Sequence, residues 1–281
     1  IITGFFEGRE RDFLIGFGTS TIACVGAIFF QVVGGMLADA YGWNYGFLVY
    51  LFPIWILAIT FLFLPEPKKQ EVPNASIKDV LFKAPKTVYG FTVGQIIFSA
   101  FVFGYVTNIS IIIQTEGLGN ATEAGLAISL FTTGTLLTGF FFGKLRSILP
   151  NLIVPLGVLL TATGILWCST VGSLTMIFLA SVLGGMGLGI VLPGVLARVS
   201  ELSNIAKGIS FVGIAAAGQG LGGIVSPYMF AAILSVFGLE GGRSTLFMAS
   251  IGLFILAIVW GIIAARKSPL TINDSEGQTE V

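Results

Sequence analysis

The chain has 281 residues, of which 55% are hydrophobic and only 10% are charged, and its mean hydropathy is +0.96. Soluble domains carry about a quarter charged residues, so this composition excludes a soluble fold and indicates an integral membrane protein. The net charge is zero and histidine is absent. The chain therefore offers neither a basic face for nucleic acid nor an imidazole for a metal site or for acid–base catalysis.

Eight apolar stretches are long enough to cross a bilayer of ~30 Å, which takes ~20 helical residues. They lack the polar–apolar alternation of barrel strands, and in hydrocarbon every backbone amide must be satisfied within its own segment. We therefore expect an all-α integral membrane protein. The expected spans are residues 13–38, 46–64, 88–114, 123–143, 152–170, 173–197, 208–236 and 245–265.

Basic residues are distributed unevenly over the connections between these spans. Thirteen of the 14 lysines and arginines fall on one side, and only Arg243 falls on the other. Under the positive-inside bias this places both visible termini in the cytoplasm, and it supports eight spans because one span more or fewer would mix the two sides. Tyr41, Trp43 and Tyr45 cluster at an outer boundary, as interface aromatics do. The thirteen are Arg9, Arg11, Lys68, Lys69, Lys78, Lys83, Lys86, Lys144, Arg146, Arg198, Lys207, Arg266 and Lys267.

The longest connection divides the chain into unequal parts. We expect residues 1–64 to hold two helices, residues 65–87 to form a cytoplasmic loop, residues 88–265 to form a six-helix bundle, and residues 266–281 to be a disordered tail. Within the loop, residues 77–81 have the spacing of a short surface helix. Because the chain begins in loop-like sequence without an initiator methionine or a signal peptide, we expect a fragment of a longer protein.

The first span carries one amide, Gln31, in an otherwise apolar segment. A helical projection places Gln31 on a face of small residues, including Ala27, Gly34 and Gly35, and places Phe29 on the opposite, lipid-like face. Gln31 is therefore expected to face protein or water. An interhelical hydrogen bond within a membrane is worth only ~0.6 kcal/mol on average, so helix packing and a place in the solute pathway both remain open for Gln31.

The third span is the most polar. A stripe of hydrogen-bonding side chains and one aromatic ring covers a third of its circumference, with Tyr105 and Asn108 roughly opposite. Uncharged polar groups along a full span need water, a solute or another helix beside them. We favour cavity lining, with ordinary interhelical bonding as the alternative. The stripe consists of Thr92, Gln95, Ser99, Phe103, Thr107, Ser110 and Gln114.

The seventh span contains "GQGLGG", residues 218–223, which matches a dinucleotide-binding pattern. That interpretation requires a strand before the glycines, whereas these lie inside a long apolar run. Close helix contact with bending at Gly222, Gly223 and Pro227 is the preferred interpretation, and Gln219 lies on a small polar face of this span.

Charged side chains lie only at the ends of the spans or in connections. Ion-coupled pathways place an ionisable group at membrane depth, so a coupling carboxylate is expected outside these residues. A phosphate-binding loop, a Cys/His metal pattern and a Ser–His arrangement are also missing, so we expect no enzyme, no cofactor and no metal site.

Several segments, taken in order, resemble helices five to twelve of the twelve-helix major facilitator superfamily. "GWNYGFLVYL" is similar to its connection between helices five and six, and "GFFFGKLRS" resembles its glycine-rich basic loop motif. "GMGLGIVLPGVLARVSEL" and "GQGLGGIVSP" resemble helices ten and eleven of drug-exporting members. The antiporter motif of helix five is only partly present, because Phe30 and Gln31 stand at its Gly-Pro positions while Gly26, Gly34 and Gly35 are kept.

The resemblance implies alternating access of two six-helix bundles about a midplane site, with helices seven and ten lining the cavity. The candidate solute-binding residues are Gln31, Thr92, Gln95, Ser99, Phe103, Tyr105, Asn108 and Gln219. The candidate residues for conformational change are Gly34, Gly35, Gly139, Gly143, Lys144, Arg146, Gly222, Gly223 and Pro227.

The function that we expect is secondary active transport of a small neutral or amphipathic solute, as multidrug or metabolite efflux coupled to protons. The alternative is a facilitator or symporter for a sugar or another small metabolite, which differs in whether cells accumulate or exclude labelled solute. A membrane receptor or a membrane-embedded enzyme is a further alternative. The expected partners are the solute, the lipid bilayer and protons, without nucleic acid, and the expected location is the plasma membrane.

Overall fold

The described part of the protein, a computed structural model covering residues 23–63, 85–201 and 205–266, consists of helices and short connections without a strand. This confirms the all-α prediction, and all eight expected spans have a helical counterpart long and apolar enough to cross a membrane. The 3₁₀ helix η2 and the helix α4 together form the second span. The elements are α3 (Ala23–Tyr41), η2 (Trp43–Leu51), α4 (Phe52–Phe63), α6 (Lys86–Thr115), α7 (Ala121–Ile148), α8 (Ile153–Thr170), α9 (Leu174–Glu201), α10 (Ile205–Phe237) and α11 (Arg243–Arg266).

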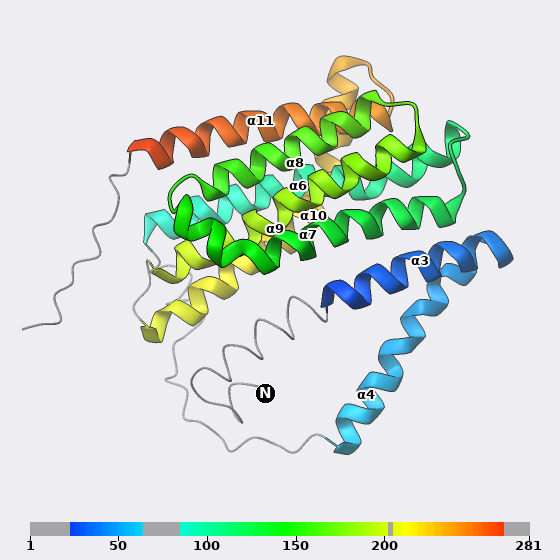
Figure 1. The fold of residues 1–281 in the computed structure, drawn as a ribbon, viewed down its shortest axis with the longest axis horizontal. Coiled ribbons are helices and arrows are strands. Elements are labelled where there is room, and N and C mark those ends of the chain that lie inside the picture. The colour runs from blue at the N-terminus through cyan, green and yellow to red at the C-terminus, as the bar shows by residue number, and fades with distance from the viewer. Residues whose placement is uncertain (1–22, 64–84, 202–204, 267–281) are drawn as a thin grey trace, which may run out of the picture.

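Two parts can be distinguished in Figure 1. Helices α6 to α11 lie side by side and form what we call the six-helix part, whereas α3, η2 and α4 form the two-helix part. Helix α3 runs along α7, and α4 leaves the bundle at an angle (Figure 1). The expected surface helix at 77–81, the tail and the first ten residues of the first span lie outside the described residues.

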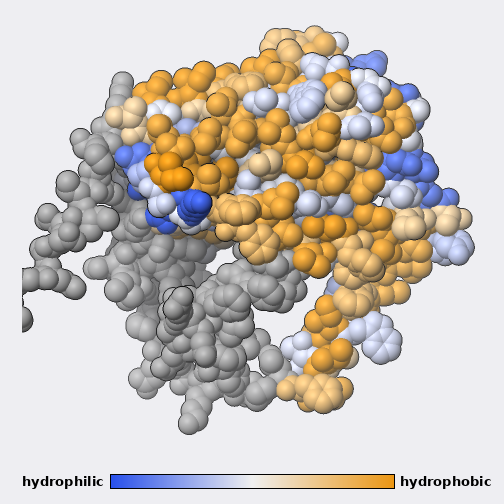
Figure 2. Space-filling model, viewed as in Figure 1, coloured by the Kyte–Doolittle hydropathy of each residue, from blue (hydrophilic) through white to orange (hydrophobic). Residues whose placement is uncertain are grey.

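Successive helices run in opposite directions, so every second connection lies at the same end of the bundle. One end, which we call the outer end, holds the end of α3 and the starts of α7 and α11; the other, the inner end, holds Lys144 and Arg198. Arg198 Nη2 donates to Asn151 Oδ1 at 2.7 Å, which ties α9 to the connection between α7 and α8. Hydrophilic residues gather at the ends of the six-helix part, and an apolar surface lies between them (Figure 2).

Helix α9 is the centre of the six-helix part because its glycines allow two neighbours to approach. A Cβ on Gly185 would collide with the backbone of Phe131 in α7, and one on Gly184 would lie 3.0 Å from the Phe131 ring. A Cβ on Gly164 of α8 would lie 2.5 Å from the Cα of Gly184. Van der Waals contact between closely packed helices replaces the hydrophobic effect inside a membrane, so these glycines stabilise the bundle.

Candidate functional site

The two parts meet along one seam between α3 and α7. A Cβ on Gly35 would lie 2.5 Å from the carbonyl oxygen of Ala121, so the two backbones are nearly in contact. Ser129 Oγ donates to the carbonyl oxygen of Ile28 at 3.0 Å. This confirms that the small face of the first span packs on protein, and the opposite face is exposed, with Phe29 at 60%. We call these contacts the α3–α7 seam.

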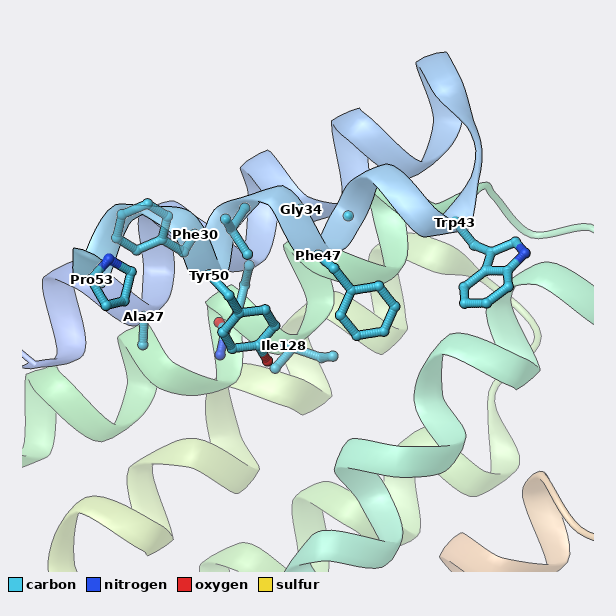
Figure 3. Close-up of a pocket in the computed structure, with 12 residues that line it drawn as sticks. Ala27, Phe30, Gly34, Trp43, Phe47, Tyr50, Pro53 and Ile128 are labelled. Atoms are coloured by element: carbon cyan, nitrogen blue, oxygen red, sulfur yellow. The ribbon is translucent and has the colours of Figure 1, made fainter. Parts of the chain in front are cut away.

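A pocket of about 500 Å³ lies beside this seam, between α3, η2 and α7. Figure 3 shows the rings of Trp43, Phe47 and Tyr50 in a row along η2, with Ile128 on α7 close to them. The volume falls within the range of about 300–1,000 Å³ that is typical of small-molecule sites. The lining consists of Ala27, Phe30, Gln31, Gly34, Trp43, Gly46, Phe47, Val49, Tyr50, Pro53, Gly125 and Ile128.

The pocket wall is aromatic, and small residues lie where α3 and η2 cross beside it. The ring centroids of Trp43 and Phe47 are 6.1 Å apart, and those of Phe47 and Tyr50 are 6.2 Å apart. Gly34 and Gly46 let α3 and η2 cross closely, since a Cβ on Gly46 would lie 3.3 Å from the carbonyl oxygen of Gly34. Aromatic faces of this kind bind planar apolar groups by stacking and edge contacts.

Gln31 supplies the amide of this pocket. Its Oε1 accepts a hydrogen bond from Thr132 Oγ1 at 3.3 Å, and its Nε2 makes no hydrogen bond to any residue that the structure describes. The side chain is half-buried. Gln31 therefore packs on α7 and also lines the pocket, and its place in a solute pathway stays a prediction.

The polar stripe of the third expected span divides into two along α6. Toward the inner end, Thr92 and Ser99 are buried against α10, where a Cβ on Gly222 would lie 2.6 Å from the Cβ of Ser99. Toward the outer end, Thr107 and Gln114 are exposed. Interhelical packing thus occupies the first half of the stripe, and cavity lining by the second half stays a prediction.

Gln95 is a special case within the buried half. It is 0% exposed, and its Nε2 donates to Ser99 Oγ at 3.3 Å. Its Oε1 has no hydrogen-bond partner. Since nearly all buried polar atoms are paired in native proteins, this acceptor favours a role for Gln95 in binding a donor group, which stays a prediction.

The remaining candidate solute-binding residues lie outside the pocket beside the seam. The hydroxyl of Tyr105 donates to Ser181 Oγ at 2.7 Å inside the six-helix part, and Asn108 Oδ1 accepts from the Gly242 backbone N–H at 3.0 Å. Phe103 packs on Gly223 of α10, and Gln219 is half-buried on the same helix. These bonds tie helices together, so a direct contact of these residues with solute stays a prediction.

The candidate conformational residues fall in three places. Gly34 and Gly35 lie on the α3–α7 seam, whereas Gly222, Gly223 and Pro227 lie within the continuous helix α10, which rules out the strand required for dinucleotide binding. The other four lie in the last turns of α7, and a Cβ on either glycine there would meet nothing within 4 Å. These four are Gly139, Gly143, Lys144 and Arg146.

The pocket wall was not predicted from the sequence. Trp43 was expected to be an interface aromatic, and no role was predicted for Phe47, Tyr50 or Pro53. The spacing 43, 47 and 50 was a usable signal, since it places three aromatic rings on one side of a helix. The nine-residue 3₁₀ helix that presents them was not predictable from this spacing.

The chemistry available in the pocket is limited to apolar contact and a few neutral hydrogen bonds. None of its twelve lining residues is charged, and the described residues contain no cluster of His, Cys, Asp and Glu that could hold a metal ion. Such a lining suits neutral or amphipathic organic molecules and lacks the cationic groups that bind phosphates or carboxylates.

Comparison with known families assigns the six-helix part. Residues 91–280, 190 of the 281 residues, match the family model described as Major Facilitator Superfamily. The match begins within α6 and continues beyond the end of α11, so the two-helix part lies before it. A comparison with curated proteins found no match.

Proposed function

Since the chain belongs to the major facilitator superfamily, whose members are multi-pass membrane transporters and not enzymes, we propose that it exports small neutral or amphipathic organic solutes across the plasma membrane. The observation that carries this proposal is the uncharged aromatic pocket beside Gln31. An amphipathic solute stacks on the η2 rings and accepts a hydrogen bond from Gln31 Nε2.

The position of the pocket supports a role in alternating access. Its lining comes from α3, η2 and Pro53 of α4 on one side and from Gly125 and Ile128 of α7 on the other. A solute bound there touches both parts of the molecule at once. Relative movement of the two parts therefore changes its contacts, which is the property that a transport site requires.

Proton exchange is the proposed driving force. Among the described residues the charged side chains of the spans lie at helix ends, as Asp39 and Arg243 do. The coupling carboxylate is therefore assigned outside the described spans. The positive-inside bias orients the protein with its inner end in the cytoplasm.

The test is an accumulation assay in intact cells that express the full-length protein. We expect such cells to retain less of a neutral, planar fluorescent dye than cells with an empty vector, and to lose the difference when a protonophore collapses the proton gradient. Gln31→Leu keeps the side-chain volume and removes the amide. It should slow export about fivefold, since a neutral hydrogen bond is worth about 1 kcal/mol.

Met36→Leu is the matched control, because Met36 lies on the exposed face of the same helix at 55%. It should leave export unchanged at equal amounts of inserted protein. Equal dye retention in expressing and control cells would contradict the efflux proposal. Faster uptake of a labelled sugar in the same cells would favour the facilitator or symporter instead.

A further inference from the structure

Asp39, near the end of α3, binds the first turn of α7 from the other part of the molecule. Its Oδ1 accepts from the Ala121 backbone N–H at 2.9 Å, and its Oδ2 accepts from the Thr122 backbone N–H at 2.7 Å. The Thr122 hydroxyl also donates to Oδ2. A carboxylate at a helix N-terminus is stabilised by the exposed N–H groups and by the helix dipole.

Helix α7 does not need Asp39 to be capped. Asn120 Oδ1 accepts from the backbone N–H groups of Thr122 and Glu123, at 3.0 and 3.3 Å. In return, Glu123 Oε2 accepts from the Asn120 N–H at 2.8 Å, which completes a capping box. The Asn120 cap already satisfies the Thr122 N–H group. The Ala121 N–H group, which Asn120 does not bind, is therefore the one backbone donor that depends on Asp39.

We propose that Asp39 is a latch that holds the outer end of the α3–α7 seam closed, and that its release opens the solute path to the outer side. The latch is removable at low cost, because Asp39 is exposed and water can replace it at Ala121. Asp39 therefore joins the two parts without being required for either to fold.

The rest of the seam is suited to repeated opening. Below Asp39 it consists of close backbone contact at Gly35 and Gly125 and of hydroxyl bonds from Ser129 and Thr132. Each of these hydroxyls also has a carbonyl of its own helix within hydrogen-bond distance, so its single proton has an alternative acceptor whenever the seam opens. Among the described residues, Asp39 supplies the charged contact across this seam.

A second charged contact at the outer end lies within one part of the molecule and not between the two parts. Arg243 of α11 binds Glu116, at the end of α6, through two bonds of 2.5 and 2.6 Å. Its Nη1 donates to the Ser169 carbonyl oxygen of α8 at 3.1 Å. This clamp joins helices within the six-helix part, whereas the latch joins one part to the other.

The test uses a reporter cysteine at Ser129, which is 1% exposed and covered by α3. In a background without other cysteines, Ser129→Cys is labelled by a membrane-impermeant thiol reagent only when the seam opens. Asp39→Ala should raise the labelling rate from the outer side about tenfold, which corresponds to ~1.4 kcal/mol. Asp39→Asn keeps one acceptor oxygen and should give a smaller increase.

Asn120→Ala is the matched control, since it removes the intrinsic cap of α7 and leaves Asp39 in place. It should lower the melting temperature of the purified full-length protein without raising the labelling rate. Unchanged labelling in both Asp39 variants would overturn the latch. Equal increases in Asp39→Ala and Asn120→Ala, with equal losses of melting temperature, would also overturn it and leave Asp39 as an ordinary cap. The assay contains no transported solute, so its outcome is independent of the efflux proposal.

Discussion

The two parts of the molecule have similarly apolar sequences but pack very differently. In the six-helix part, half or more of the span windows of α6, α8 and α9 is buried inside the protein. In the two-helix part, η2 and α4 contain no buried residue. Apolar composition alone therefore does not decide how closely a helix packs, since contact with other helices also depends on what its surface allows.

The two parts also differ in their small residues. The sequence of α9 includes four glycines between residues 184 and 189, and each is buried against α7 or α8. Helix α4, by contrast, has the sequence FPIWILAITFLF, with no glycine and one alanine. Among the residues that the structure describes, α4 offers no small-residue face for a neighbouring backbone to approach.

The largest effect on the free energy of unfolding is expected when a phenylalanine of the six-helix part and one of α4 are each replaced by alanine. Phe98 of α6 is 0% exposed and Phe61 of α4 is 88% exposed. Phe98→Ala removes the contacts of a buried ring and leaves a cavity, so it should lower the free energy of unfolding by about 3 kcal/mol. Phe61→Ala should change it by less than ~0.5 kcal/mol. Unfolding by denaturant in detergent micelles measures both.

Equal losses of unfolding free energy in the two variants would show that the two parts do not differ in packing. In that case α4 would be packed as closely as α6, and its exposed surface would have to be covered in the folded protein. The amount of correctly inserted protein, measured before unfolding, separates a stability effect from failed insertion.

A smaller effect is expected at the Arg243 clamp. Both partners are about one-third exposed, so the bidentate pair should contribute only about 1 kcal/mol despite its short bonds. Arg243→Gln should lower the free energy of unfolding by that amount, and 1 M salt should reduce the difference from the unmodified protein because salt screens exposed charges. The labelling rate of Ser129→Cys should not change.

A rise in that labelling rate in Arg243→Gln would show that the clamp also controls the seam. Arg243→Lys is the informative companion, since lysine keeps the charge but cannot form the bidentate fork with Glu116. It should lie between Arg243→Gln and the unmodified protein in stability.

The sequence predicted the fold class, the eight spans and the packed face of α3, because these follow from hydrophobic length and periodicity. The glycine-rich face of α10 was also predicted as a helix contact. Gln31 bonds to Thr132 of α7, in line with the packing alternative. Each of these predictions depends on one segment at a time.

The parts of the site that were not predicted depend on two segments at once. The bond from Asp39 to Ala121 joins residues 82 positions apart, and no local pattern around Asp39 distinguishes a latch from a solvated helix end. For the same reason the wheel of the third span could not show that α10 covers Thr92 and Ser99 but leaves Gln114 exposed. Partner helices, rather than the α6 sequence, decide which half of a polar stripe is available.

Relative movement of the two parts is tested most directly by a distance measurement between spin labels at the outer end, on the full-length protein in lipid. One pair, Ala40→Cys with Thr115→Cys, spans the two parts, and the other, Thr115→Cys with Ser235→Cys, lies within the six-helix part; all three positions are exposed. We predict two populated distances for the first pair, with the longer one favoured by Asp39→Ala, and a single unchanged distance for the second. A single, invariant distance for both pairs would contradict this prediction, because the two parts would then form one rigid body.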